Sequence, residues 1–155
     1  MLRRGVNGLF SELLRIVREA IYAGIVRTGA APDSISIASA THLTTASVEE
    51  ACRGLADAHV IVVEPGTTKI RSAPPFSGVA TPFLVRAGAT AWYAPCAWDA
   101  FGIPAALDRD VAIDARCGWS GEPIPCGVDH GRSYGDGLIH LLVPAARFWD
   151  DIFYT

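Results

Sequence analysis

Residues 45–71 have the sequence TASVEEACRGLADAHVIVVEPGTTKIR, and the period of the hydrophobic pattern changes within this stretch. Up to residue 58 the apolar residues recur at three- and four-residue steps, which predicts an amphipathic helix. Residues 59–64 form an apolar run that predicts a strand, and residues 65–67 (PGT) predict a turn. Residues 68–71 predict a second strand, so a helix leads directly into a β-hairpin. The helical stripe consists of Val48, Ala51, Cys52, Leu55, Ala56 and Ala58.

Two further helices are predicted upstream, over roughly residues 7–27 and 34–42. The order helix, helix, helix, hairpin is typical of a winged-helix domain. The face of the third helix that would meet DNA carries Glu49 and Glu50 beside Arg53, which is a poor match to phosphates or to guanine edges. We therefore expect a degenerate winged helix that serves packing and dimerisation. Nucleic-acid binding is not expected, and a homodimer is left open.

Residues 73–78 (APPFSG) are predicted to form a linker that divides the chain into a domain at 1–78 and a second domain at 79–155. The expected fold class is α+β, with the winged-helix-like part followed by a small, mostly antiparallel β-sheet domain with short helices. The predicted elements of the second domain are a hairpin of 81–85 and 90–93, a helix at 96–107, strands at 111–117, 124–128 and 138–143, a loop at 131–137, a helical turn at 145–151 and the start of a strand at 152–154.

The composition excludes several classes of protein. The chain has 155 residues, a net charge of −3 and 50% hydrophobic residues, which rules out a disordered chain and a strongly cationic nucleic-acid binder. No run of 18 apolar residues occurs, and residues 1–30 lack the pattern of a signal peptide. We expect a cytoplasmic protein without membrane contact. The four cysteines form no CxxC pair and are expected to be free thiols.

The strongest local signal for chemistry is Cys96 followed by Asp99. Cys96 falls in the first turn of a predicted helix, where unpaired N–H groups and the helix dipole favour a thiolate, so we expect its thiol pKa to be lowered. Asp99 lies three residues on, hence on the same face of the helix. A thiolate beside a carboxyl group that can carry a proton suits covalent or soft-metal chemistry. The alternative is a buried, inert cysteine with Asp99 as a capping residue.

Three stretches resemble the organomercurial (alkylmercury) lyase family. They are residues 92–107 (WYAPCAWDAFGIPAAL), which contain the pattern C-A-x-D, residues 115–124 (ARCGWSGEPI) and residues 140–144 (HLLVP). The resemblance implies a lyase-like second domain that needs no cofactor and takes an organomercurial or another soft-metal small molecule. It implies that Cys96 is the mercury-binding nucleophile and that Asp99 is the proton shuttle and a third metal ligand. Trp92, Tyr93, Trp98 and Phe101 are then expected to wall the subsite for the organic group.

The sequence departs from the family at its end. The family places a second catalytic cysteine in a strand near the C-terminus, but residues 148–155 (FWDDIFYT) contain no cysteine. Either the chain is truncated or it is a short relative with impaired lyase activity. Cys117 matches a family cysteine that is regarded as structural, Cys126 has no counterpart, and neither lies in a sequence context that activates a thiol.

Other functions stay open at this level. One is a soft-metal binder or winged-helix regulator without enzymatic activity, and another is a relative recruited to different thiol chemistry in a biosynthetic pathway. A zinc site made of Cys117, Cys126 and His130 is disfavoured by its loose spacing.

Overall fold

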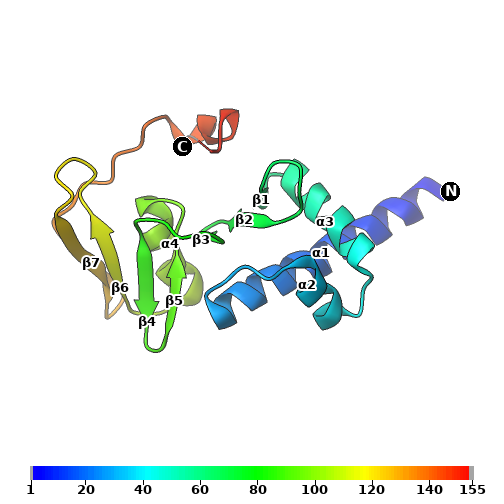
Figure 1. Cartoon of the computed structure of the whole chain (residues 1–155), viewed down its shortest axis with the longest axis horizontal. Helices are drawn as coiled ribbons and strands as arrows, with labels where there is room; N and C mark the ends of the chain where they lie inside the picture. Colours follow the sequence, from blue (N-terminus) through cyan, green and yellow to red (C-terminus); the bar gives the residue numbers. More distant parts are fainter. Residues whose placement is uncertain (1, 154–155) are drawn as a thin grey trace.

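The computed structural model describes residues 2–153, with side chains described from residue 10 onward. The N-terminal half holds three α-helices followed by a short hairpin (Figure 1). Asp33 and Thr44 are the N-caps of the second and third helices, and their side chains accept hydrogen bonds from the backbone N–H groups of Ser36 and Ser47. The elements are α1 (Leu2–Thr28), α2 (Ser34–Thr41), α3 (Thr45–Asp57), β1 (Val62–Val63) and β2 (Ile70–Ala73).

Within residues 2–153, the eight strands belong to one antiparallel sheet with the order β1-β2-β3-β5-β4-β6-β7-β8. The predicted hairpin of 81–85 and 90–93 is confirmed, as are the strands around 111–117 and 124–128. Strand β8 arises within the predicted loop at 131–137. The predicted helix at 96–107 is confirmed as α4 (Ala97–Leu107), which continues through Pro104. The remaining strands are β3 (Phe76–Ser77), β4 (Leu84–Ala87), β5 (Thr90–Tyr93), β6 (Val111–Arg116), β7 (Pro123–Asp129) and β8 (Arg132–Tyr134).

The predicted linker at 73–78 is wrong as a linker, because it contains β3 and the end of β2. Ser77 pairs with Ser72 on one side and with Tyr93 on the other, so the sheet continues across the expected domain boundary. Phe76 is buried and makes edge-to-face contacts with the rings of Tyr22 and Trp92. A Pro-rich stretch thus serves as a central part of the sheet. The division of the chain at residue 78 stays a prediction.

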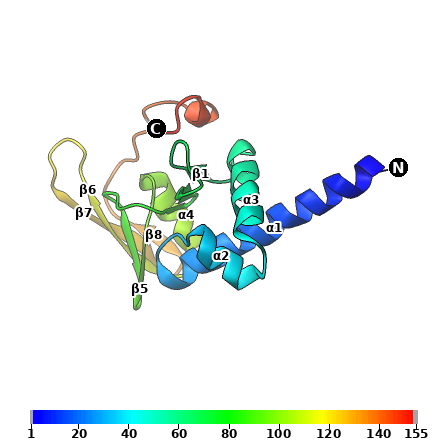
Figure 2. The same ribbon diagram turned by 45° about the vertical axis from the view of Figure 1, so that its right-hand side comes forward.

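The core lies between the helices and the sheet. Val17, Ile21 and Ile25 of α1 are fully buried, as are Val85 of β4 and Trp92 of β5. Figures 1 and 2 show α1, α2 and α3 gathered at the β1 side of the sheet, with the C-terminal part of α1 reaching toward β5. The fold is therefore a mixture of helices and one antiparallel sheet. In the described part of the chain, no helix has the length and apolarity needed to cross a membrane.

The C-terminal segment differs most from the prediction. Residues 138–143 were expected to form a buried strand, but they form no strand, and Leu138 is 99% exposed. The predicted helical turn at 145–151 is confirmed as the 3-10 helix η1 (Ala145–Asp150). The predicted strand at 152–154 is wrong at residues 152–153, which lie in a turn, and Tyr154 is outside the described residues. Among the described residues, the sheet order ends at β8, and the apolar run 138–143 pairs with no strand.

Candidate active site

Cys96 is the N-cap of α4, and its backbone is extended (φ −148°, ψ 176°). This geometry turns the side chain toward the first turn of the helix, where the backbone N–H of Asp99 lies 3.4 Å from Sγ. The thiol in turn donates a hydrogen bond to Oδ2 of Asp99 over 3.3 Å. The spacing of three residues thus brings thiol and carboxylate into direct contact.

Our expectation of a lowered thiol pKa is wrong for Cys96. Burial raises the pKa of this thiol, and the neighbouring charge of Asp99 adds to that effect. The backbone N–H groups of Asp99 and Trp98 lower the pKa, as expected at a helix N-terminus, but they do not outweigh burial. Burial also raises the pKa of Asp99. The thiol therefore keeps its proton at neutral pH and donates it in a hydrogen bond to the Asp99 carboxylate.

Both side chains open into a cavity of about 840 Å³. The cavity has contributions from α1, from the β1–β2 hairpin, from the loops around β3, from the start of α4 and from the C-terminal segment. Apolar side chains make up most of its wall. The lining residues are Tyr22, His59, Val60, Val62, Arg71, Ser72, Pro74, Ser77, Val79, Thr81, Phe83, Pro95, Cys96, Ala97, Trp98, Asp99, Ile139, His140, Leu141, Leu142, Phe148, Trp149, Ile152 and Phe153.

The four predicted wall residues have different locations. Trp98 is 65% exposed and lines both this cavity and a neighbouring one of about 880 Å³. Phe101 lines only the neighbouring cavity, and Tyr93 is half-buried in β5, opposite Leu84 of β4. The structure contradicts the wall role of Trp92, because its ring is fully buried in the core.

The indole of Trp92 has structural partners on α1. Its N–H donates to the carbonyl oxygens of Ile25 at 3.0 Å and Val26 at 3.2 Å, at the C-terminal end of the helix. Side chains alternate along β5, so Trp92 faces the helices while its neighbours face elsewhere. Trp92 thus connects α1 to strand β5 of the sheet.

Tyr22 is a cavity residue that the sequence analysis missed. Its hydroxyl donates to the carbonyl of Pro74 over 3.0 Å, and burial together with the nearby charge of Asp99 raises its pKa. Tyr22 is next to the buried stripe of α1, and its sequence context carries no signal for a site. Only the packing of α1 against the β3 region brings it near Asp99.

Cys96 is the one cysteine among the described residues that line this cavity. Cys52 and Cys126 are buried in α3 and β7, and burial raises the thiol pKa of both. Cys117 follows β6 in a turn, where hydrogen bonds from the backbone and side chain of Ser120 lower its pKa. The prediction that Cys117 lacks an activating context is therefore wrong.

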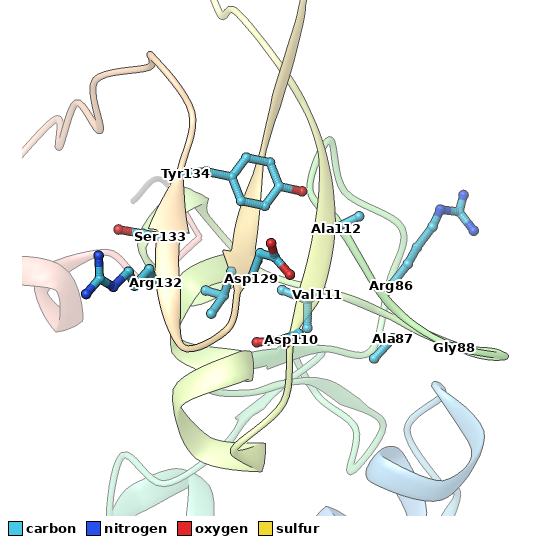
Figure 3. Close-up of a pocket in the computed structure, with 11 residues that line it drawn as sticks. Arg86, Ala87, Gly88, Asp110, Val111, Ala112, Asp129, Arg132, Ser133 and Tyr134 are labelled. Carbon is cyan, nitrogen blue, oxygen red and sulfur yellow. The ribbon is translucent and has the colours of Figure 1, made fainter.

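A third hollow lies at the outer end of the sheet, beside β6, β7 and β8 (Figure 3). It has a volume of about 730 Å³ and mixes the charges of Asp110, Asp129 and Arg132. Among the described residues, the group of metal-binding side chains close enough to share one ion is Asp110, Asp129 and His130, all exposed. Cys117 and Cys126 are not part of it, so the zinc arrangement considered above is not formed.

The part of the chain that contains Cys96 is similar to known proteins. The family model described as MerB: Alkylmercury lyase matches residues 76–152. The crystal structure of the mercury-bound form of MerB2 is similar to this chain, with a TM-score of 0.61 and 30% identity. The match covers 79% of this chain and 58% of that one, so the chain spans less than two thirds of that relative. No curated protein sequence matches. Through residues 76–152, the chain belongs to the alkylmercury lyase family.

Proposed function

We propose that this chain binds organomercurial compounds through Cys96 and cleaves their carbon–mercury bond with a proton carried by Asp99. The observation that carries the proposal is the contact between the Cys96 thiol and the Asp99 carboxylate, 3.3 Å apart at the wall of an apolar cavity. The family membership and the similarity to a mercury-bound structure support it. At the level of the family this is an alkylmercury-lyase-like function.

The binding step begins with a protonated thiol. As Cys96 attacks a compound R–Hg–X, the S–H bond breaks and its proton moves to Asp99, whose carboxylate accepts the thiol hydrogen bond in the resting protein. The new S–Hg bond replaces the Hg–X bond, and X leaves as an anion. Hg(II) is a soft cation that prefers thiolate ligands, which favours this exchange.

The cleavage step uses the same proton. The carboxylic acid of Asp99 protonates the carbon bound to mercury, so that R–H leaves and the carbon–mercury electron pair becomes the new C–H bond. Mercury stays on the sulfur of Cys96, beside the regenerated carboxylate as a second ligand. The raised pKa of Asp99 suits a group that has to hold this proton until the carbon accepts it.

The presence of one thiol among the described lining residues limits the expected rate of carbon–mercury cleavage. A second electron-rich ligand weakens the remaining Hg–C bond, and Cys96 is the one thiol among the described lining residues. We therefore expect slow protonolysis and slow release of Hg(II). The same observation favours a second candidate function, a soft-metal binder that captures organomercurials without turning them over.

The N-terminal elements have a supporting role in this proposal. We propose that α1–α3 with the β1–β2 hairpin form a degenerate winged-helix unit, which covers the site through Tyr22, His59 and Arg71. Glu49 and Glu50 on α3 support a packing role for this unit over DNA binding. Pairing of two copies of the chain through this unit is part of the same proposal.

The test is a stoichiometric reaction with phenylmercury. To remove the partly exposed competing thiol, the experiment uses a Cys117→Ser background. We expect about one equivalent bound per chain in a Cys96-dependent manner, as one accessible thiolate requires, with slow release of benzene. Cys96→Ser removes binding, and Asp99→Asn keeps binding but stops benzene release. Binding without any benzene supports the soft-metal binder, and rapid multiple turnover means that another group supplies the second electron-rich ligand.

A further inference from the structure

The C-terminal segment, residues 138–153, forms the outer wall of the Cys96 cavity. Figures 1 and 2 show this segment running back from the β7–β8 end of the sheet and passing over α4 toward β1. Leu141, Phe148, Trp149 and Phe153 are among the lining residues that it contributes. Within the described residues, the segment adds no strand to the sheet. It is therefore a single covering layer.

Aromatic contacts join this layer to the N-terminal half of the chain. The ring of Trp149 stacks on His59 with centroids 4.2 Å apart and an angle of 4° between the planes. The guanidinium carbon of Arg71 lies 5.3 Å from the centroid of the Phe153 ring, and Arg71 is itself held by Glu64 over 3.1 Å. These contacts connect the end of the segment to the region just after α3 and to β2, on the side of the cavity away from the β7–β8 end.

The size and lining of the cavity favour a large organic group. A volume of about 840 Å³ is within the range of pockets that hold drug-sized ligands, which is roughly 300 to 1,000 Å³. A methyl group on mercury leaves most of this space to water. An aryl group has a flat apolar face, and the covering layer provides the aromatic side chains of Phe148, Trp149 and Phe153 in the same cavity.

We infer that residues 138–153 are the specificity wall of this site, and that Trp149, held by His59, selects aryl organomercurials over methylmercury. This inference rests on the proposed function, because it assumes that mercury is held at Cys96. The selection arises from differential contact. Both compounds place mercury on the same sulfur, but only the aryl ring contacts the aromatic side chains of the wall. An aromatic pair contributes enough to change an affinity about three- to tenfold.

The test measures the affinities of phenylmercury and methylmercury in competition with glutathione, by titration calorimetry, in the Cys117→Ser background. Trp149→Ala is expected to lower the phenyl-to-methyl affinity ratio by about three- to tenfold. His59→Asn removes the stacking ring and is expected to lower the ratio in the same direction. Asparagine is chosen because His59 has φ +59°, a left-handed conformation that asparagine tolerates. Trp149→Phe, which keeps an aromatic ring at the wall, is expected to retain most of the ratio.

Trp119→Ala is the matched control, because Trp119 is 97% exposed in the β6–β7 turn and lines none of the three cavities. It is expected to leave the ratio unchanged. If phenylmercury and methylmercury bind through Cys96 and Trp149→Ala leaves the ratio as in Trp119→Ala, the specificity wall is wrong while the proposed function stands. If neither compound binds in a Cys96-dependent manner, the proposed function fails and the inference fails with it.

Discussion

Replacing Asp99 by asparagine separates the two roles that we assign to its carboxylate. Asparagine has nearly the same shape and keeps the backbone N–H that contacts Cys96 Sγ, but it has no charge and carries no transferable proton. In the native protein, ionisation of Cys96 places two negative charges 3.3 Å apart. Both side chains are partly exposed, so the dielectric constant of water gives a conservative value for their repulsion, about 1.3 kcal/mol.

This repulsion corresponds to about a tenfold lower fraction of thiolate at neutral pH. Asp99→Asn is therefore expected to raise the thiolate fraction of Cys96 about tenfold. The freed thiolate is a weaker base, and with a Brønsted coefficient of about 0.45 each thiolate reacts about threefold more slowly. The net expectation is alkylation of Cys96 about three- to fourfold faster than in the native protein. The same variant is expected to lose benzene release from phenylmercury.

The assay is iodoacetamide labelling followed by peptide mass spectrometry across neutral and alkaline pH. Cys52 is the internal control for folding, because it is buried in α3 and its pKa is raised to about 11. Asp57→Asn, at the exposed end of α3, removes the same charge away from the site and is expected to leave Cys96 unchanged. Labelling of Cys96 in Asp99→Asn at or below the native rate refutes the electrostatic coupling. Retained benzene release refutes the proton transfer.

Three further predictions concern other parts of the chain. Cys117 is expected to be alkylated before Cys96. Ser120→Ala is expected to slow the alkylation of Cys117, because a hydrogen bond that lowers the Cys117 pKa is lost. Labelling of Cys117 that is insensitive to this change contradicts the explanation. Trp92→Phe is expected to lower the free energy of unfolding by about 1–3 kcal/mol in urea denaturation, because the indole N–H bonds to the carbonyls of Ile25 and Val26 are lost and the smaller ring leaves space in the core, while mercury still binds at Cys96. Reduced binding with unchanged stability contradicts the core role. Duplex DNA is expected to bind weakly in fluorescence anisotropy, and tight binding with a steep salt dependence overturns the packing role of α3.

The features that the sequence predicted well depend on short-range geometry. The contact between Cys96 and Asp99 follows from a helix start and a spacing of three residues, and both are visible in the sequence. The hairpin of β4 and β5 follows from two apolar runs around a glycine-containing turn, with Val85 opposite Trp92 in the ladder. Such features can be predicted without knowing which parts of the chain pack against them.

The features that the sequence missed depend on partners far along the chain. Trp92 looks like a site residue from its neighbours, yet α1 provides the carbonyls that bind its indole and bury it. Residues 138–143 have the composition of a buried strand, yet β8 occupies the edge of the sheet and the run becomes part of the cavity wall. Burial of an aromatic ring and pairing of a strand are decided by the whole fold, and alternation within one stretch leaves them open.

The pKa of Cys96 shows how two opposing effects are resolved at the site. The helix N-terminus favours the thiolate through nearby N–H groups, whereas burial and the charge of Asp99 favour the thiol, and the second pair of effects is larger. For a nucleophile that acts alone this is a disadvantage, because less of it is ionised. For protonolysis it has a different consequence. A resting thiol stores the proton that the carbon will need, and Asp99 is in place to accept it when sulfur binds mercury. The proton then never has to come from solvent through an apolar cavity. A raised thiol pKa at this position is thus consistent with the proposed reaction.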